Sequence, residues 1–215
     1  MITMKHRSIR RSPLALALLG LLFEGPMHPY RMQQRIKEYG KDQVVNVRDR
    51  ASIYQTIERL LRDGLIEVAQ TARDERWPER TVYQLTEEGR ETTLVWLREM
   101  LSTPAREFPE FPAALAYLPL LTPAETLQLL EARLVKLEGE LARTEAMLTG
   151  AGRTLPRLFL IEEEYRLAVL RAELEWVRSV AEDLRSGCFT WSEEWLREVA
   201  SSLETGGSFP KEGNT

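Results

Sequence analysis

The chain has 215 residues, of which 43% are hydrophobic and 29% charged, with one cysteine and two histidines. This length allows one large or two small domains, and the composition excludes wholesale disorder, a collagen-like repeat and a disulfide scaffold. Cys188 has no second cysteine to pair with, and His6 and His28 are too far apart in the sequence for a zinc-binding spacing.

The longest apolar run, Leu14–Phe23, is ten residues long and too short to span a bilayer. Four basic residues precede it, as in a signal peptide, but no small-residue cleavage site follows. Instead, residues 24–26 (Glu-Gly-Pro) end the run as a helix stop. We therefore expect a cytoplasmic protein.

The net charge of −4 hides an asymmetry between the two parts of the chain. Residues 1–90 hold 16 Lys and Arg against 12 Asp and Glu, whereas the remaining residues hold 13 against 21. A basic first part can face a polyanion and an acidic second part would be repelled by one.

Three helices are predicted in the first part. Ser12 and Pro13 are an N-cap and a first helical residue, and Gly25-Pro26 ends this first helix. Pro29 opens a second short helix that ends near Gly40, and residues 43–47 are a candidate short strand. The third helix spans about residues 49–63.

The third helix has a buried and a polar face. Ile53, Ile57, Leu60 and Leu61 repeat at helical spacing and form the buried stripe. A helical projection places the polar residues on the opposite face, with Glu58 and Asp63 near it: Ser52, Gln55, Thr56, Arg59 and Arg62.

Two strands and a fourth helix follow. Residues 65–70 and 80–85 alternate apolar and polar side chains, and the polar stretch between them is typical of a projecting hairpin tip. Thr86 caps the next helix, with Glu87 and Glu88 in its first turn. This order predicts a helix-turn-helix, made of the second and third helices, with the hairpin as its wing.

Residues 103–112 contain three prolines and are predicted to be a linker. A short helix is expected around residues 113–118. Thr122-Pro123-Ala124-Glu125 is a capping box that opens a long helix. A second long helix is expected from about residue 156 to residue 185, and a second capping box at residues 190–193 opens a last helix to about Leu203. Residues 206–215 are predicted to be a flexible tail.

Both long helices carry leucines at alternating spacings of three and four, which is typical of a coiled-coil seam. The second also carries another apolar stripe, formed by Tyr165, Val169, Ala172 and Trp176. Two apolar faces on one helix exceed what an isolated hairpin buries, so a symmetric homodimer is expected. The predicted dimerisation residues are Leu127, Leu130, Leu134, Leu137, Leu141, Leu167, Leu170, Leu174, Trp176, Val177 and Leu184.

The predicted fold is therefore mainly α, in two domains. A winged helix-turn-helix domain of three helices and a β-hairpin occupies residues 1–102. The linker over 103–112 leads to an antiparallel long-helix dimerisation domain over 113–205.

Four stretches resemble the PadR family of bacterial transcriptional regulators. They are residues 12–20 (SPLALALLG), residues 28–32 (HPYRM), residues 52–66 (SIY followed by Leu60 and DGLI) and residues 80–89 (RTVYQLTEEG). The acidic C-terminal part is similar to the dimerisation region of the longer family members. The chain departs from the family at Gln55, where proline is common, and at Thr81 and Val82, where lysine and tyrosine are common.

The resemblance implies a DNA-binding regulator, usually a repressor, that binds a pseudo-palindromic operator as a dimer and responds to a small molecule or other signal. Gln and Arg side chains pair with adenine and guanine in the major groove, while Ser, Thr, Tyr and wing arginines reach bases or phosphates. The candidate DNA-binding residues are Tyr30, Arg31, Ser52, Tyr54, Gln55, Thr56, Arg59, Arg73, Arg76 and Arg80. Basic residues at positions 5–11 are a candidate phosphate-binding arm.

Several other interpretations stay open. The wing carries acidic residues among its arginines, so it can also be a self-neutralising loop, and Tyr54 can be a core residue. The tryptophans at positions 96, 176, 191 and 195 could line an aromatic effector site, although packing roles are favoured. A run of three glutamates at 162–164 is more typical of a solvated face than of a metal site.

No nucleophile and base stand at a recognisable spacing, and no glycine-rich phosphate loop is present, so neither catalysis nor a cofactor is expected. The alternative class is a winged-helix protein-interaction module, in which the helical domain recruits a partner without specific DNA binding.

Overall fold

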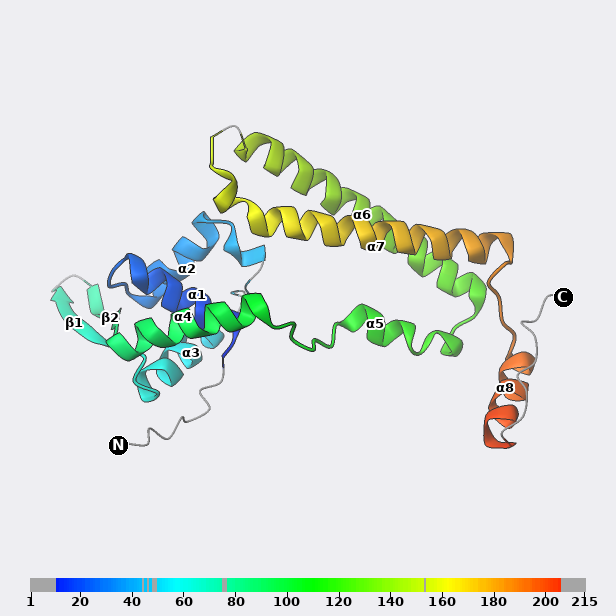
Figure 1. The fold of residues 1–215 in the computed structure, drawn as a ribbon, viewed down its shortest axis with the longest axis horizontal. Helices are drawn as coiled ribbons and strands as arrows, with labels where there is room; N and C mark the ends of the chain where they lie inside the picture. Colours follow the sequence, from blue (N-terminus) through cyan, green and yellow to red (C-terminus); the bar gives the residue numbers. More distant parts are fainter. Residues whose placement is uncertain are drawn as a thin grey trace. The chain divides into compact units, whose positions relative to one another are not determined.

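A computed structural model describes residues 11–43, 45, 47, 50–74, 77–152 and 154–205; it leaves out the side chains of residues 43, 50, 70–80 and 205. The chain divides into two compact units, Met1–Arg106 and Glu107–Thr215 (Figure 1). The mainly helical architecture with one two-stranded sheet confirms the predicted fold class. Among the described residues, no helix combines the length and the apolarity that crossing a membrane would require.

Three helices build the core of the N-terminal unit: α1 (Pro13–Glu24), α2 (Pro29–Glu38) and α3 (Arg50–Arg62). The Ser12 hydroxyl accepts a hydrogen bond from the Ala15 amide and caps α1, as predicted. The most deeply buried side chains of this core come from all three helices and from the residue before the first strand: Leu18, Leu19, Met32, Ile36, Ile53, Ile57, Leu60 and Leu65.

Between α2 and α3 the structure differs from the candidate strand over residues 43–47. A short 3-10 helix occupies Lys41–Gln43, and Val45 and Val47 are buried in the core without strand pairing. Residues 44 and 46 lie outside the described part. The valines correctly indicated burial, but a short apolar connection can be buried without pairing as a strand.

The wing is an antiparallel pair of strands, β1 (Ile66–Asp74) and β2 (Trp77–Leu85), which pair from Ile66↔Leu85 outward. Both strands extend further into the hairpin tip than the sequence predicted. The loop before α2 adds a short bridge to β2, because Met27 and Tyr83 exchange two backbone hydrogen bonds of 3.0 Å. This bridge fixes the base of the wing beside the N-terminus of α2.

The helix α4 (Glu87–Ser102) closes the N-terminal unit. The Thr86 hydroxyl accepts from the Gly89 amide at 2.9 Å and donates to the Gly64 carbonyl at 2.7 Å. The same threonine therefore caps α4 and connects it to the end of α3. Trp96 of α4 is buried in the core.

The C-terminal unit contains α5 (Glu110–Leu115), α6 (Pro123–Ala151), α7 (Ile161–Ser186) and α8 (Glu193–Thr205), with 3-10 helices at Leu118–Leu120 and Arg157–Phe159. α5 begins inside the predicted linker, because Pro112 lies in its first turn, where a missing amide hydrogen costs nothing. The cap of α8 is Ser192, whose hydroxyl accepts from the Trp195 amide, and not Thr190 as predicted.

α6 and α7 form an antiparallel pair whose leucine seam is internal to one chain (Figure 1). The predicted dimerisation leucines pack here: Leu130, Leu137, Leu170, Leu174, Val177 and Leu184 are buried, and Leu127, Leu134, Leu141 and Leu167 are half-buried. Trp176 is the one member of that set that is exposed, at 45%. A seam with this spacing packs equally well within and between chains, so the sequence pattern could not distinguish the two.

Ion pairs run along both edges of the seam. On one edge, Glu131, Glu138 and Glu145 of α6 pair with Arg185, Arg178 and Arg171 of α7. On the other edge the order of charges alternates, because Arg133 pairs with Glu173 whereas Glu140 pairs with Arg166.

The alternating edge fixes the register of the two helices. A slip of one heptad would keep opposite charges together on the first edge. On the second edge the same slip would oppose Arg133 to Arg166 in one direction and Glu140 to Glu173 in the other. Like charges in such positions destabilise the pairing, so only the observed register matches charges on both edges.

Candidate nucleic-acid interface

The outward face of α3 is rotated from the face that the sequence predicted. Its exposed side chains are Ala51, Tyr54, Gln55, Glu58 and Arg62, which follow one another at helical spacing. Ser52 is half-buried. Of the predicted residues on this helix, Tyr54 and Gln55 therefore lie fully on the accessible face.

Two of the predicted contact residues are turned inward. Thr56 is 9% exposed, and its hydroxyl donates to the Ser52 carbonyl at 2.7 Å. Arg59 is half-buried, and its Nη2 donates to the Ser12 hydroxyl at 3.2 Å. α1 and α3 are in contact. Thr56 is therefore part of the domain interior, and Arg59 binds the N-cap residue of α1.

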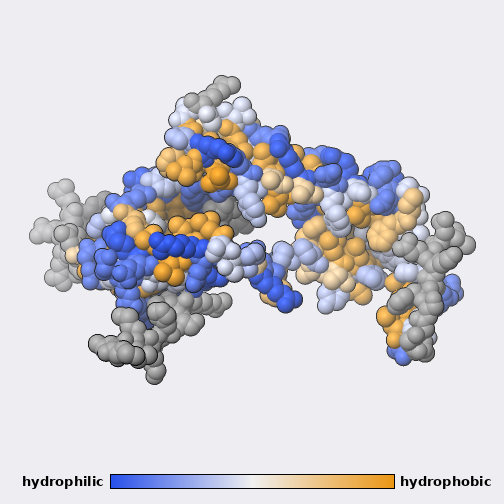
Figure 2. Space-filling model, in the orientation of Figure 1, coloured by the Kyte–Doolittle hydropathy of each residue, from blue (hydrophilic) through white to orange (hydrophobic). Residues whose placement is uncertain are grey.

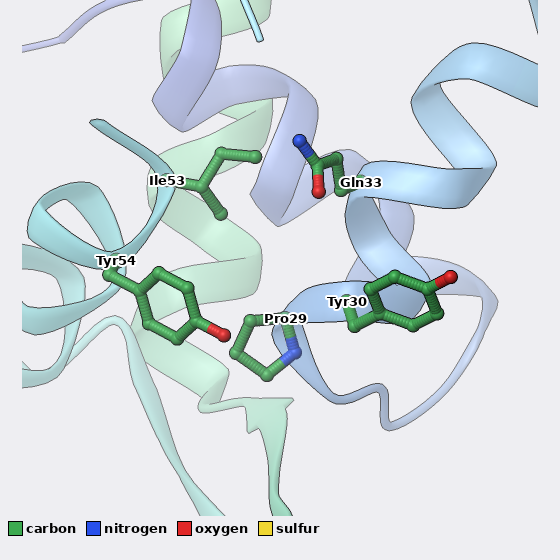
Figure 3. Close-up of a pocket in the computed structure, with 5 residues that line it drawn as sticks. All are labelled: Pro29, Tyr30, Gln33, Ile53 and Tyr54. Atoms are coloured by element: carbon green, nitrogen blue, oxygen red, sulfur yellow. The ribbon is translucent and has the colours of Figure 1, made fainter. Parts of the chain in front are cut away.

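A pocket opens between the N-terminal turns of α2 and α3, lined by Pro29, Tyr30, Gln33, Ile53 and Tyr54 (Figure 3). The Tyr54 ring is directed across it toward Pro29, whereas the Tyr30 ring points away from Tyr54. Both tyrosines are 51% exposed. Their phenol groups are therefore accessible to a partner at the helix-turn-helix surface, and the core interpretation of Tyr54 does not apply.

His28 and its neighbours shape the start of α2. The His28 Nδ1 atom accepts a hydrogen bond from the Arg31 amide at 3.1 Å, which caps the helix, and its ring stacks on Tyr30 at 6.2 Å between centroids. The Arg31 side chain forms an ion pair with Glu38 at 2.8 Å. This pair is exposed, so a phosphate can compete for the guanidinium at small cost.

Tyr83 lies on β2, at the base of the wing. Partial burial raises the pKa of its phenol, the nearby Tyr54 and Glu58 raise this pKa further, and a hydrogen bond with Thr81 opposes the rise. The phenol consequently stays neutral, with its proton, at physiological pH. Tyr54 and Glu58 of α3 are therefore close enough to Tyr83 of β2 to influence its phenol.

The remaining predicted residues fall outside the description. The backbone of Arg73 and Arg80 belongs to β1 and β2, but their side chains, like the whole of Arg76, are not among the described atoms. The same holds for basic residues 5–10 of the candidate arm. Arg11, the one described member of that group, forms an ion pair with Glu99 at 2.8 Å.

The sequence interpretation missed three features of this surface: the place of Ala51 on the outward stripe, the pocket beside Pro29 and Gln33, and the bridge between Met27 and Tyr83. Each depends on how α1, α2 and β2 pack around α3. The sequence offered one signal for these features. The alternation of side chains along residues 80–85 placed Tyr83 on one face of its strand.

The helix-turn-helix, the paired strands beside it and the capped α4 define a winged helix-turn-helix domain. Residues 18–94 match the family described as the transcriptional regulator PadR-like family. The resemblance found in the motifs is thereby confirmed over residues 18–94, which match the model of this family.

Solved structures with similar folds extend the likeness over both units. Bacillus subtilis PadR in complex with operator DNA is 21% identical, with a TM-score of 0.65 over 80% of this chain and 99% of that chain. The same protein with p-coumaric acid gives 20% identity and a TM-score of 0.63 over 80% and 98%. The Vibrio cholerae virulence activator AphA gives 17% and 0.60 over 80% and 98%. A search of curated protein sequences found no match.

Proposed function

We propose that this protein is a DNA-binding transcriptional regulator of the cytoplasm that binds a pseudo-palindromic operator as a homodimer. α3 enters the major groove, Tyr30 and Tyr54 contact the phosphate backbone, and the wing with its arginines reaches the neighbouring minor groove. Two copies place their recognition helices roughly 34–36 Å apart, one turn of DNA.

The observation that carries this proposal is the accessible surface of α3. Gln55 is exposed beside Tyr54 and Glu58, and the exposed phenols of Tyr30 and Tyr54 lie at the pocket between the N-terminal turns of α2 and α3. Helix N-termini attract phosphate, and glutamine can pair bidentately with adenine. The similarity of fold to a PadR bound to operator DNA supports the same use of the helix.

Repression is the proposed mode, with release from DNA by a small aromatic or other effector. The PadR structure with p-coumaric acid supports an effector, and repression is the usual mode of the family. AphA, which has a similar fold, is described as an activator, so a reporter gene placed behind the selected operator decides the sign of regulation.

The second apolar stripe of α7 is the proposed dimer interface. Tyr165 is 73% exposed, Val169 46% and Trp176 45%, and their spacing of four and seven residues places them on one side of the helix. Hydrophobic residues are exposed among hydrophilic ones on the surface of the helical C-terminal unit (Figure 2). Because the leucine seam is buried within the chain, this stripe is the apolar surface of α7 that remains for a second copy.

Replacing Tyr165 by glutamate is expected to convert the dimer into a monomer while the α6–α7 pair stays folded. The substitution places a charge on the stripe but leaves the internal seam intact. Sedimentation measures the mass, and helical circular dichroism measures the fold. Val135→Glu is the matched control, because Val135 is 70% exposed on α6, on the side away from the seam. If Y165E remains dimeric, this stripe is not the interface.

Gln55→Ala is expected to weaken operator binding by about 1–3 kcal/mol while leaving binding to random duplex nearly unchanged. The operator is first selected from fragments of genomic DNA, and binding is then titrated at several salt concentrations. Phosphate contacts require that affinity falls steeply with salt.

Two results would contradict this assignment. If Gln55→Ala lowered the affinity for operator and for random duplex equally, Gln55 would not recognise a base. A folded dimer with no affinity for any duplex at low salt would instead favour the protein-interaction module.

A further inference from the structure

An acidic residue lies in the middle of the α3 surface that we propose contacts the bases. Glu58 lies on the outward stripe of α3, one turn after Tyr54 and Gln55 and two turns after Ala51. A carboxylate brought toward a polyanion loses affinity unless a hydrogen-bond donor on the DNA compensates it.

The nearest cations along α3 do not neutralise Glu58. Arg59 donates to the Ser12 hydroxyl on the inner side of the helix. Arg62 is one turn away, but its Nε lies 3.5 Å from Asp63. Among the described side chains of the wing, the phenol of Tyr83 is close enough to Glu58 for the carboxylate to raise its pKa, and this phenol is neutral at physiological pH. Glu58 is exposed, and no cation among the described side chains pairs with its carboxylate.

The edges of the bases in the major groove restrict what such a carboxylate can bind. Guanine and thymine present acceptor oxygens, which repel it, and adenine presents its amino group beside the acceptor N7. Cytosine presents the N4 amino group as a donor without a neighbouring acceptor of its own.

We infer that Glu58 accepts a hydrogen bond from a cytosine N4 amino group and selects a C·G pair at one position of each operator half-site. This inference rests on the proposed DNA-binding function and adds a residue that determines its specificity. Glu58 contributes to discrimination between sequences and reduces affinity for sequences that lack cytosine there.

The test is a selection of bound duplexes from a random library by the full-length protein, its E58A variant and its E58Q variant. The wild-type protein is expected to enrich cytosine at one position per half-site, with binding about tenfold weaker when thymine replaces it. E58A is expected to lose this preference, to keep the preferences at the other positions and to bind random duplex more tightly than the wild-type protein does. E58Q keeps the shape of the side chain, and its amide group shifts the preference toward adenine.

Glu91→Gln is the control. It removes one negative charge from an exposed site on α4, which is not part of the proposed DNA-contacting surface of α3. It is expected to leave the selected sequence unchanged. If E58A binds all sequences more tightly and still selects the same cytosine, Glu58 only repels phosphate and the inference is overturned. If the wild-type protein binds no duplex at low salt, the proposed function itself fails. These two failures are distinguished by the wild-type titration alone.

Discussion

Gly89→Ala is expected to destabilise the N-terminal unit by about 3 kcal/mol, at the upper end of the cost of overpacking. A methyl group at this position would lie 1.8 Å from the Leu65 carbonyl oxygen and 2.8 Å from its carbon. Backbone atoms cannot move aside as a flexible side chain can, so α4 must shift away from the start of the wing. Hydrogen exchange of the amides in α3, β1 and α4 measures this loss locally.

The effect should extend beyond the glycine itself. The Leu65 carbonyl accepts from the Thr86 amide at 3.2 Å, and the Thr86 hydroxyl bonds both Gly64 and Gly89. A shift of α4 therefore breaks the cap and the connection between α3 and the wing together. We expect weakened DNA binding in consequence, because the wing would no longer be held beside α3.

Gly20→Ala is the matched control. Gly20 lies inside α1 with nothing within 4 Å of an added methyl group, so alanine should stabilise the unit by about 0.5–1 kcal/mol. Equal melting temperatures for G89A and the wild-type protein would show that position 89 has room for a methyl group beside the Leu65 carbonyl, contrary to this prediction.

Local sequence signals predicted much of this fold. Ser12, Thr86 and Thr122 each cap the helix that follows, because capping depends on residues three or four positions apart. The period of the leucines likewise predicted that α6 and α7 are long helices with an apolar seam.

Features that depend on a third element could not be predicted in this way. The period of α3 alone placed Thr56 on its polar face, but the elements packed around α3 bury this residue. In the same way, the leucine spacing could not show whether the partner helix belongs to the same chain. The alternation of charges at Arg133 and Glu140 was present in the sequence, yet its role became visible only once α7 supplied the opposite charges.

Arg166→Met is expected to destabilise the C-terminal unit by about 3 kcal/mol. The Arg166 guanidinium bonds Glu163 at 2.8 Å and Glu140 at 2.9 Å, and the Glu163 side chain is only 9% exposed. Methionine preserves the apolar stem of the arginine but leaves the buried carboxylate without a cation. Chemical denaturation followed by circular dichroism, combined with hydrogen exchange in α6 and α7, measures this loss.

Two further variants distinguish the effect of leaving a buried charge unpaired from the effect of losing any ion pair. Arg178→Met breaks the pair with Glu138, whose two side chains are 60% and 53% exposed, and should cost less than about 1 kcal/mol. The double variant E163L/R166M should recover most of the stability lost in R166M, because no buried charge is then left unpaired. If E163L/R166M is no more stable than R166M, the isolated carboxylate is not the cause, and Arg166 stabilises the hairpin through Glu140 and the register of the two helices instead.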